Sequence, residues 1–259
     1  MRIARFLTNG NEHYGVVEGD EIKEIAGDIF GDFKVTTRRY LLAKVKLLAP
    51  MKPGQIWCPG LNFASHLHVS ASATGQSSLP KHPQPWTKGV NSLAGPEDNI
   101  VIPKASKGNV HYEGELVAVI GKRCRNVSPA QAMDYVCGYT CGNDVSERDW
   151  QKADNSYWRA KGSDTFCPIG PWIETEASPT NVEMIVRVNG KEAQRASAKD
   201  MLFDFATIIS HISQQVTLQP GDALFSGTTG DTAAMKPGDV VEVEMTGVGV
   251  LRNYVKAES

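Results

Sequence analysis

Residues 111–120 read HYEGELVAVI, and this stretch constrains the fold more than any other part of the chain. A run as apolar as LVAVI indicates a buried strand. Side chains alternate between the two faces of a strand, so His111, Glu113 and Glu115 are predicted to share one face beside the core. Buried like charges repel each other and lose their hydration. The stretch therefore needs a compensating positive charge, and a bound cation is one physical answer.

A third carboxylate occurs in the segment NDVSERDWQ at 143–151, where Asp144 follows the strand-like YTCG. Three carboxylates suit Mg²⁺, Mn²⁺ or Ca²⁺ better than Zn²⁺. The alternative is a solvated strand edge with an aspartate that caps a turn. Spacing alone leaves both interpretations open.

The pattern of strands and breakers predicts an α+β, strand-rich chain with two parts. Residues 1–52 contain the short strand-like runs IARFL, HYGVVEG and EIKEIA, which indicate a small β domain, and the breakers in MKPG mark the boundary to the next part. Residues 53–259 form a second strand-rich domain with two helices. One helix is predicted in SPAQAMDYV, with Ser128 as N-cap, and the other has apolar residues at helical spacing from Met201 to Val216.

Residues 65–96 have a different composition from their surroundings. The stretch SHLHVSASATGQSSLPKHPQPW is rich in small, polar and proline residues and poor in core-forming ones. A long segment of this kind inside a compact domain is typical of a mobile lid or a binding loop.

Composition excludes several classes of partner. The net charge of −2 gives no basic field, so neither nucleic acid nor an anionic membrane is expected as a partner. The first residues, MRIARFLTNG, lack the apolar core of a signal peptide, which together with the absence of a long apolar run predicts a soluble, cytoplasmic protein. The five cysteines lack the paired short spacings of a zinc site and are interpreted as reduced structural thiols; they lie at 58, 124, 137, 141 and 167.

Several motifs together resemble the fumarylacetoacetate hydrolase family, including its acylpyruvate hydrolase and hydroxyhepta-dienedioate isomerase branches. They are EGELVAVIGK, GYTCGNDVSERDWQ, RAKGSDTFCPIGPW, FSGTTGD and VVEVEMTGVGVLRN, in the family's order from about Pro53 to the C-terminus. The resemblance implies a mixed β-roll catalytic domain, a homodimer and one divalent cation, Mg²⁺ or Mn²⁺. It implies that Glu113, Glu115 and Asp144 are the metal ligands. Residues 1–50 look like the small N-terminal domain of many members.

The same resemblance implies roles for three further residues. Lys161, in RAKGSD, matches a lysine near the metal and substrate, where it would bind a carboxylate or an enolate. Gln151 is similar to a glutamine that binds substrate or water. Thr228, in SGTTG, is similar to a threonine that contacts the substrate carboxylate. Without the resemblance, Lys161 would be interpreted as a surface lysine at a turn.

The chain departs from the family in the lid motif Asn-Tyr-x-x-His-x-x-Glu. It reads NFASHLHV, so Asn62 and His66 match, Phe63 replaces the tyrosine and Val69 replaces the glutamate. His66 is the candidate catalytic base. Without a carboxylate it is expected to lose control of its tautomer and to be a weak base, unless another acid substitutes.

The other histidines have less specific interpretations. His68 and His82 are expected to be solvated loop residues, and His211 a packed core or interface residue on the second helix. His111 shares the predicted face of the glutamates, so it either ligates the metal, supports a ligand or only packs there.

These observations lead to three hypotheses for function. The first is a metal-dependent hydrolase that cleaves a carbon–carbon bond in a small anionic keto acid, an acylpyruvate or a 1,3-diketo acid. The second is an isomerase or decarboxylase of a 2-hydroxy-dienoate or 2-keto diacid, because all these reactions pass through an enolate that a chelating metal stabilises. The third is a catalytically silent, metabolite-binding member, against which the complete ligand set argues.

Overall fold

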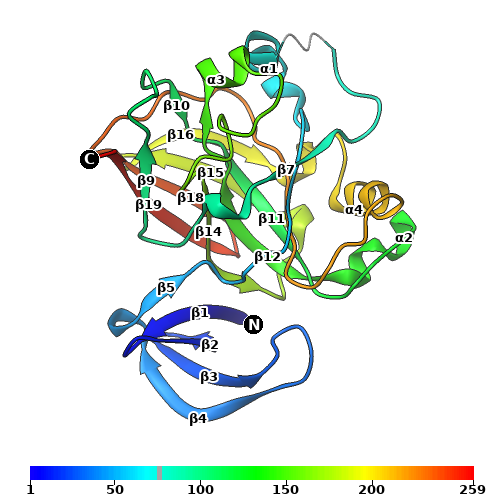
Figure 1. Cartoon of the computed structure of the whole chain (residues 1–259). Helices are drawn as coiled ribbons and strands as arrows, with labels where there is room; N and C mark the ends of the chain where they lie inside the picture. The colour runs from blue at the N-terminus through cyan, green and yellow to red at the C-terminus, as the bar shows by residue number, and fades with distance from the viewer. Residues whose placement is uncertain (75–77) are drawn as a thin grey trace.

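The computed structural model describes residues 1–74 and 78–259, and it confirms the strand-rich α+β class (Figure 1). The first 50 residues contain the three predicted strands and two others, β4 and β5. Their bounds are β1 (Arg2–Thr8), β2 (Asn11–Glu18), β3 (Glu21–Gly27), β4 (Phe33–Leu41) and β5 (Lys46–Leu48). Strands β1 and β2 are joined by Asn9 and Gly10, which have φ values of 50° and 77°. Asparagine and glycine adopt this conformation readily, so the two-residue hairpin turn follows from the sequence.

The N-terminal strands continue into the central sheet. Its order is β4-β3-β2-β1-β14-β12-β11-β17-β6-β7, with β5 paired to β1 and β8 paired to β14. The strands not yet given are β6 (Ile56–Pro59), β7 (Pro85–Lys88), β8 (Leu93–Ala94), β11 (Gly114–Ile120), β12 (Val136–Asn143), β14 (Cys167–Glu174) and β17 (Ala223–Phe225). The connection between the two parts is the antiparallel pair β1–β14, in which Ile3 lies opposite Ile173.

A second sheet packs against the first across the main core. Its order is β16-β15-β18-β19-β9, with bounds β9 (Asn99–Ile102), β15 (Glu183–Val188), β16 (Lys191–Ser197), β18 (Val240–Met245) and β19 (Gly249–Ala257). Strand β11 has no exposed residue: Leu116, Ala118 and Ile120 face the core shared with this sheet, while Val117 and Val119 face a second cluster. Burial on both faces explains why LVAVI is continuously apolar rather than alternating.

The helices are short and lie at the edges of the sheets (Figure 1). They are α1 (Leu67–Thr74), α2 (Pro129–Ala132), α3 (Arg148–Ala153) and α4 (Phe205–Ser213), with 3₁₀ turns at Leu42–Lys44, Ala64–His66, Val90–Ser92, Met133–Tyr135, Pro179–Asn181 and Ala198–Asp200. The predicted helix after Ser128 is present. The helix predicted from Met201 to Val216 is shorter, because Asp204 caps it by accepting a hydrogen bond from the Thr207 amide at 2.8 Å. No helix in the described part of the chain is long and apolar enough to cross a membrane.

Two expectations need correction, one for the segment 65–96 and one for His211. The described part of this segment is not a bare loop, since it contains α1, β7 and β8; residues 75–77, also part of the predicted lid, lie outside the described residues. His211 is exposed rather than packed in the core, and its ring stacks on that of His82 with centroids 5.7 Å apart. The five cysteines are free thiols.

Candidate metal centre and active site

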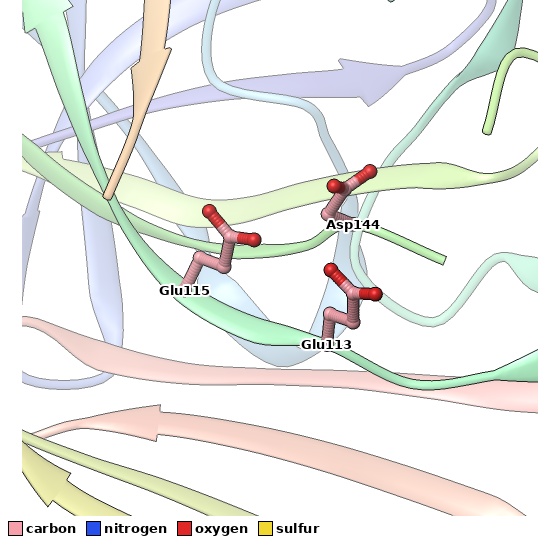
Figure 2. A group of neighbouring side chains, drawn as sticks. All are labelled: Glu113, Glu115 and Asp144. Atoms are coloured by element: carbon pink, nitrogen blue, oxygen red, sulfur yellow. The ribbon is translucent and has the colours of Figure 1, made fainter. Parts of the chain in front are cut away.

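Three buried carboxylates converge where β11 and β12 meet (Figure 2). Glu113 directly precedes β11, Glu115 is the second residue of that strand, and Asp144 directly follows β12, whose Asn143 pairs with Gly114. The Asp144 amide donates to the Glu113 carbonyl at 2.8 Å, which fixes the two backbones together. Each residue offers one oxygen, and these oxygens lie within 4.8 Å of one another. The antiparallel pairing of two predicted strands is therefore what brings the three acids together.

Three buried cations surround these carboxylates. Lys161 Nζ lies 2.5 Å from Asp144 Oδ2 and 2.9 Å from Glu113 Oε2, so it is not the surface lysine of the alternative interpretation. Arg148 Nη1 lies 2.6 Å from Glu113 Oε1, and Lys88 Nζ is paired with Asp144 Oδ1. The formal charges of three carboxylates and three cations cancel within this cluster.

Lys88 and Arg148 were not among the residues predicted from the sequence. Lys88 is the last residue of β7, opposite Ile56 of β6, and its side chain is fully buried. Nothing in the stretch PQPWTKGV distinguishes this lysine from a solvated one. Arg148 begins α3 within the motif NDVSERDWQ. Its closeness in sequence to the candidate ligand Asp144 was a signal that could have identified it as a site residue.

The surroundings shift the pKa values of Glu113 and Glu115 in opposite directions. Burial by itself would raise the pKa of Glu113, but Lys161 and Arg148 more than offset burial, and the pKa of Glu113 is lowered. The pKa of Glu115 is raised well above its usual value by burial and by the negative charges of Asp144 and Glu113. Its recorded polar partner is the Gly227 amide, which donates to Oε2 at 2.6 Å. Glu115 is thus the carboxylate that most needs a cation.

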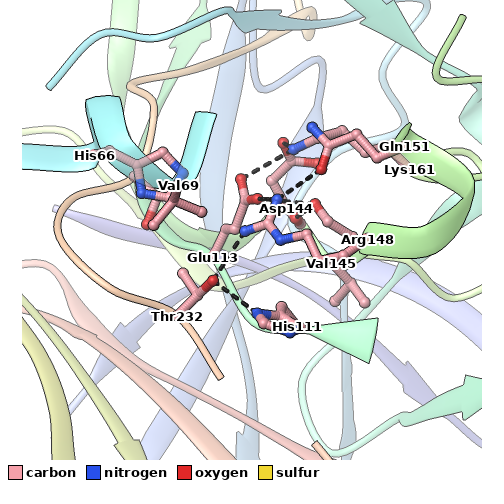
Figure 3. Close-up of polar contacts among 12 residues, drawn as sticks. His66, Val69, His111, Glu113, Asp144, Val145, Arg148, Gln151, Lys161 and Thr232 are labelled. Carbon is pink, nitrogen blue, oxygen red and sulfur yellow. Dashed lines mark hydrogen bonds and ion pairs between the residues drawn. The ribbon is translucent and has the colours of Figure 1, made fainter. Parts of the chain in front are cut away.

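His66 is held by a backbone carbonyl rather than by a carboxylate (Figure 3). Its Nδ1 lies 2.6 Å from the carbonyl oxygen of Gly230. A carbonyl can only accept, so Nδ1 carries the proton and, in the neutral ring, Nε2 keeps its lone pair. Val69, one turn further along α1, is half-buried and apolar. Control of the tautomer is therefore not lost, contrary to the expectation from the missing glutamate.

The charge state of His66 follows from its position. Burial lowers its pKa, and the neighbouring Glu113 and the Gly230 carbonyl only partly offset this effect. The ring is therefore neutral near pH 7, and it lines the same cavity as the three carboxylates. No hydrogen-bond partner for Nε2 is found among the described residues.

Gln151 and Thr228, the other two predicted site residues, also line this cavity. Gln151 accepts a hydrogen bond from Arg148 Nη1 at 2.8 Å. The Thr228 hydroxyl donates to the Gly114 carbonyl at 3.1 Å and accepts from Gln194 Nε2 at 3.2 Å. Both side chains are fixed by neighbours within the protein.

His111 lies outside the group that could hold a metal. Its Nδ1 is 2.8 Å from Thr232 Oγ1 and its Nε2 is 2.9 Å from Asn109 Oδ1, so both nitrogens are engaged (Figure 3). Burial, followed by the charge of Arg148, lowers its pKa to about 4. Direct ligation, one of the open interpretations, does not agree with this geometry.

The cavity has a small inner chamber and an adjoining outer groove. The chamber, about 60 Å³, is lined by the three carboxylates, His66, Arg148 and Lys161 among others. The groove, about 1030 Å³, shares Trp86, Gln151 and Tyr157 with it. Trp86 and Tyr157 meet edge to face with centroids 5.2 Å apart, and Lys161 Nζ lies 5.4 Å from the centre of the Trp86 ring. A chamber of this size admits the head of a small molecule, and a longer body would lie in the groove.

The donor set fits a hard divalent cation. All three candidate ligand atoms are carboxylate oxygens, which Mg²⁺, Mn²⁺ and Ca²⁺ prefer. One carboxylate, Glu115, has no cationic side chain of its own within ion-pairing distance among the described residues. A cation at the junction of the three oxygens would supply that missing charge.

Family models, related sequences and solved structures all indicate the same family for this chain. Residues 55–256 match the family model "Fumarylacetoacetate (FAA) hydrolase C-terminal", and residues 1–50 match "Rv2993c-like, N-terminal". Protein Rv2993c of Mycobacterium tuberculosis is 38% identical over 98% of each chain. The structure of 5-carboxymethyl-2-hydroxymuconate delta-isomerase from Mycobacterium smegmatis is 37% identical, with a TM-score of 0.92 over the whole of both chains. Maleylpyruvate hydrolase of Sphingobium sp. SYK-6, solved with manganese(II) and pyruvate, is 28% identical over both whole chains with a TM-score of 0.82.

Proposed function

Because the chain belongs to the fumarylacetoacetate hydrolase family, we propose that it is a divalent-metal-dependent hydrolase that cleaves a carbon–carbon bond in a small acylpyruvate or 1,3-diketo acid. The observation that carries this proposal is the grouping, in one small chamber, of three carboxylates, the cations Lys161 and Arg148, and an imidazole with a free lone pair. The carboxylates fit a metal, the cations fit an anionic substrate, and the imidazole fits the removal of a proton.

Glu113, Glu115 and Asp144 would hold Mg²⁺ or Mn²⁺. When bound, such an ion polarises the carbonyl of a chelated keto acid and stabilises an enolate. Manganese accompanies pyruvate in the structure of the maleylpyruvate hydrolase relative, which supports this choice of ion and of substrate class.

The chain's own residues would then bind the substrate and move the proton. Lys161 and Arg148 would attract the carboxylate or enolate oxygen, while Gln151 and Thr228 would orient the head of the substrate in the chamber. His66 Nε2 would take a proton from water as it attacks the carbonyl carbon, and Nδ1 would stay hydrogen-bonded to Gly230. The bond between that carbon and the neighbouring one would then break, the enolate would leave, and its carbon would take up the proton held on Nε2. The small chamber favours a head of a few atoms, and the acyl tail would extend into the outer groove.

Isomerisation or decarboxylation is a second candidate, and one observation favours it. The Gly230 carbonyl orients His66 but carries no full negative charge, so it stabilises an imidazolium less than a glutamate would. An imidazolium that is stabilised less gives up its Nε2 proton more readily. In an isomerisation, His66 could take a proton from one carbon of the substrate and return it to another. The delta-isomerase relative supports this candidate.

The products formed from a substrate panel would separate these candidates. Purified protein should be given Mg²⁺ or Mn²⁺ and then acylpyruvates, oxaloacetate and dienoic diacids, while enol absorbance, pyruvate and CO₂ are followed. Pyruvate released with a free acid would identify hydrolysis, a shift of absorbance without pyruvate would identify isomerisation, and CO₂ would identify decarboxylation. Activity should disappear with chelator and in Glu115→Gln but persist in Glu192→Gln, an exposed control. Turnover of no substrate in the panel would contradict the proposal.

We also propose the homodimer that the family resemblance implies, with domains at 1–52 and 53–259. Light scattering at micromolar concentration would test the dimer, with a mass of twice 28.2 kDa expected. A mass of one chain would contradict it.

A further inference from the structure

Arg148 is a cation of the centre that is hydrogen-bonded to a chain of uncharged side chains, beginning with Thr232 and His111 (Figure 3). Its Nη1 contacts Glu113 and Gln151, and its Nη2 donates to Thr232 Oγ1 at 2.9 Å. Arg148 is buried, and its Nε has no hydrogen-bond partner among the described residues. Both Nη nitrogens of this guanidinium are therefore engaged, while its Nε donor stays unpaired among the described residues.

The direction of each hydrogen bond in this chain can be assigned from chemistry. Asn109 Nδ2 donates to Asp149 Oδ1 at 2.9 Å, so its Oδ1 is the atom that faces His111. An amide oxygen only accepts, so Nε2 of His111 carries the proton. In the neutral ring Nδ1 must then accept, and the donor is the single hydroxyl proton of Thr232. The oxygen of Thr232 is left to accept from Arg148, which can only donate.

The backbone explains why these residues meet. Strands β10 (Val110–His111) and β13 (Ser146–Glu147) pair with each other, and His111 also forms a bridge with Ala234. The segment 232–235 is thereby aligned beside β10. Strand β10, strand β13 and the segment 232–235 thus lie side by side, next to Arg148.

We propose that Thr232 and His111 are positioning residues that hold Arg148 in place for an anionic oxygen in the chamber. His111 accepts the hydroxyl proton of Thr232, which leaves the lone pairs of that oxygen for Arg148, and Asn109 fixes the tautomer of His111 that accepts this proton. If the hydroxyl were absent, Nη2 would lose its hydrogen bond, and the guanidinium could turn about its contacts with Glu113 and Gln151 and away from the anionic oxygen. The proposal rests on the proposed binding of an anionic keto acid, but the proton assignments do not.

The first experiment measures oxalate binding by calorimetry to protein saturated with Mg²⁺. Thr232→Val keeps the shape of the side chain and removes both hydrogen bonds, so oxalate affinity should fall by roughly tenfold. Affinity for Mg²⁺ should change by less than about twofold, since Thr232 contacts none of the three ligands. Thr232→Ser, which retains the hydroxyl, should restore oxalate binding.

Thr140→Val is the matched control. Thr140 is also buried, but its hydroxyl has no hydrogen-bond partner in the part of the chain that the structure describes, so this change should leave oxalate affinity unaltered. The double variant Thr232→Val/His111→Leu should bind oxalate no more weakly than Thr232→Val alone, because both changes break the same chain. Full affinity in Thr232→Val, an equal loss in Thr232→Ser, or additive losses in the double variant would overturn the proposal.

A second measurement does not depend on a ligand. Nitrogen-15 spectra of the histidine side chains should show His111 with its proton on Nε2, and Thr232→Val should shift the Nδ1 resonance of that ring. A proton on Nδ1 would overturn the assignment of the chain. If the wild-type protein bound no oxalate in the presence of Mg²⁺ while these spectra were as expected, the proposed function would fail and the hydrogen-bond chain would stand.

Discussion

Glu113 and Glu115 are two residues apart, yet their surroundings shift their pKa values in opposite directions. Glu113 is paired with Lys161 and Arg148, whereas Glu115 has the Gly227 amide as its polar partner and faces two other carboxylates. Glu113 is therefore a stabilised anion, whereas Glu115 is a carboxyl group whose ionised form needs a bound cation.

Replacing the two glutamates should have opposite effects on the stability of the metal-free protein. Glu113→Gln leaves Lys161 and Arg148 partly uncompensated and should lower the free energy of unfolding by roughly 3 kcal/mol at pH 7. Glu115→Gln removes a buried carboxyl group whose ionised form is disfavoured in the folded protein, and should raise it by about 1 kcal/mol. Urea unfolding with chelator present measures both values, and equal losses in the two variants would contradict the argument.

The same shifts predict the pH dependence. A lowered carboxyl pKa stabilises the folded state above the unfolded pKa of about 4.3, and that contribution is lost below it; a raised pKa instead costs stability as pH rises above about 4.3. The difference in stability between Glu115→Gln and wild type should therefore grow from pH 4 upward. Thermal unfolding of both proteins across pH 4–8 checks this, and parallel curves would refute it.

Metal binding should release a proton, because Glu115 must ionise before it can act as a ligand. The affinity for Mg²⁺ should consequently rise with pH. Calorimetric titrations in two buffers with different ionisation enthalpies give the number of protons released per metal. Titrations that give the same enthalpy in both buffers would show that Glu115 is already ionised in the metal-free protein.

Lys161→Met should separate metal affinity from turnover. The variant loses the cation shared by Glu113 and Asp144, so the metal-free protein should be destabilised by roughly 3 kcal/mol while Mg²⁺ binds more tightly. Turnover of anionic substrates should nevertheless fall, because a substrate-binding charge is gone. Lys152→Met, an exposed residue on α3, is the control and should change none of these quantities. Unchanged kinetics in Lys161→Met would exclude its role in binding.

Val69→Glu should have little effect on hydrolysis, within about threefold, although general-base assistance is worth roughly 10²- to 10⁴-fold. The Nδ1 proton of His66 is already donated to Gly230, so a new carboxylate would find no free N–H to accept. His66→Gln should remove most of the activity. A large gain in Val69→Glu would mean that the carbonyl is a poor substitute for a carboxylate in this site.

The carboxylate cluster could be predicted from the sequence because its causes are local. Strand alternation relates Glu113 to Glu115, and the end of the neighbouring strand fixes Asp144, so only one strand pairing had to be inferred. The small β module could be predicted from its turns for the same reason.

The cations and the carbonyl that complete the site depend on contacts between distant segments. Lys88 reaches Asp144 across 56 positions, and Gly230 reaches His66 across 164. No local pattern encodes such distances. The helix α1, in LHVSASAT, was missed because this sequence has little amphipathic pattern; Ser65 and His66 beside it are held by Thr229 and Gly230 of the opposite loop.

The pairing of β1 with β14 has a consequence for how the chain can be shortened. Ile3 lies opposite Ile173, and both belong to one apolar cluster that also includes Ile25 and Ile169. A fragment beginning near residue 53 would expose the backbone N–H and C=O groups of β14 that pair with β1, together with the apolar side chains that β1 covers. An exposed strand edge of this kind favours pairing with other chains. The first 50 residues are thus expected to protect the edge of β14 from edge-to-edge association with other chains. A substitute for them would have to supply a strand that pairs with β14.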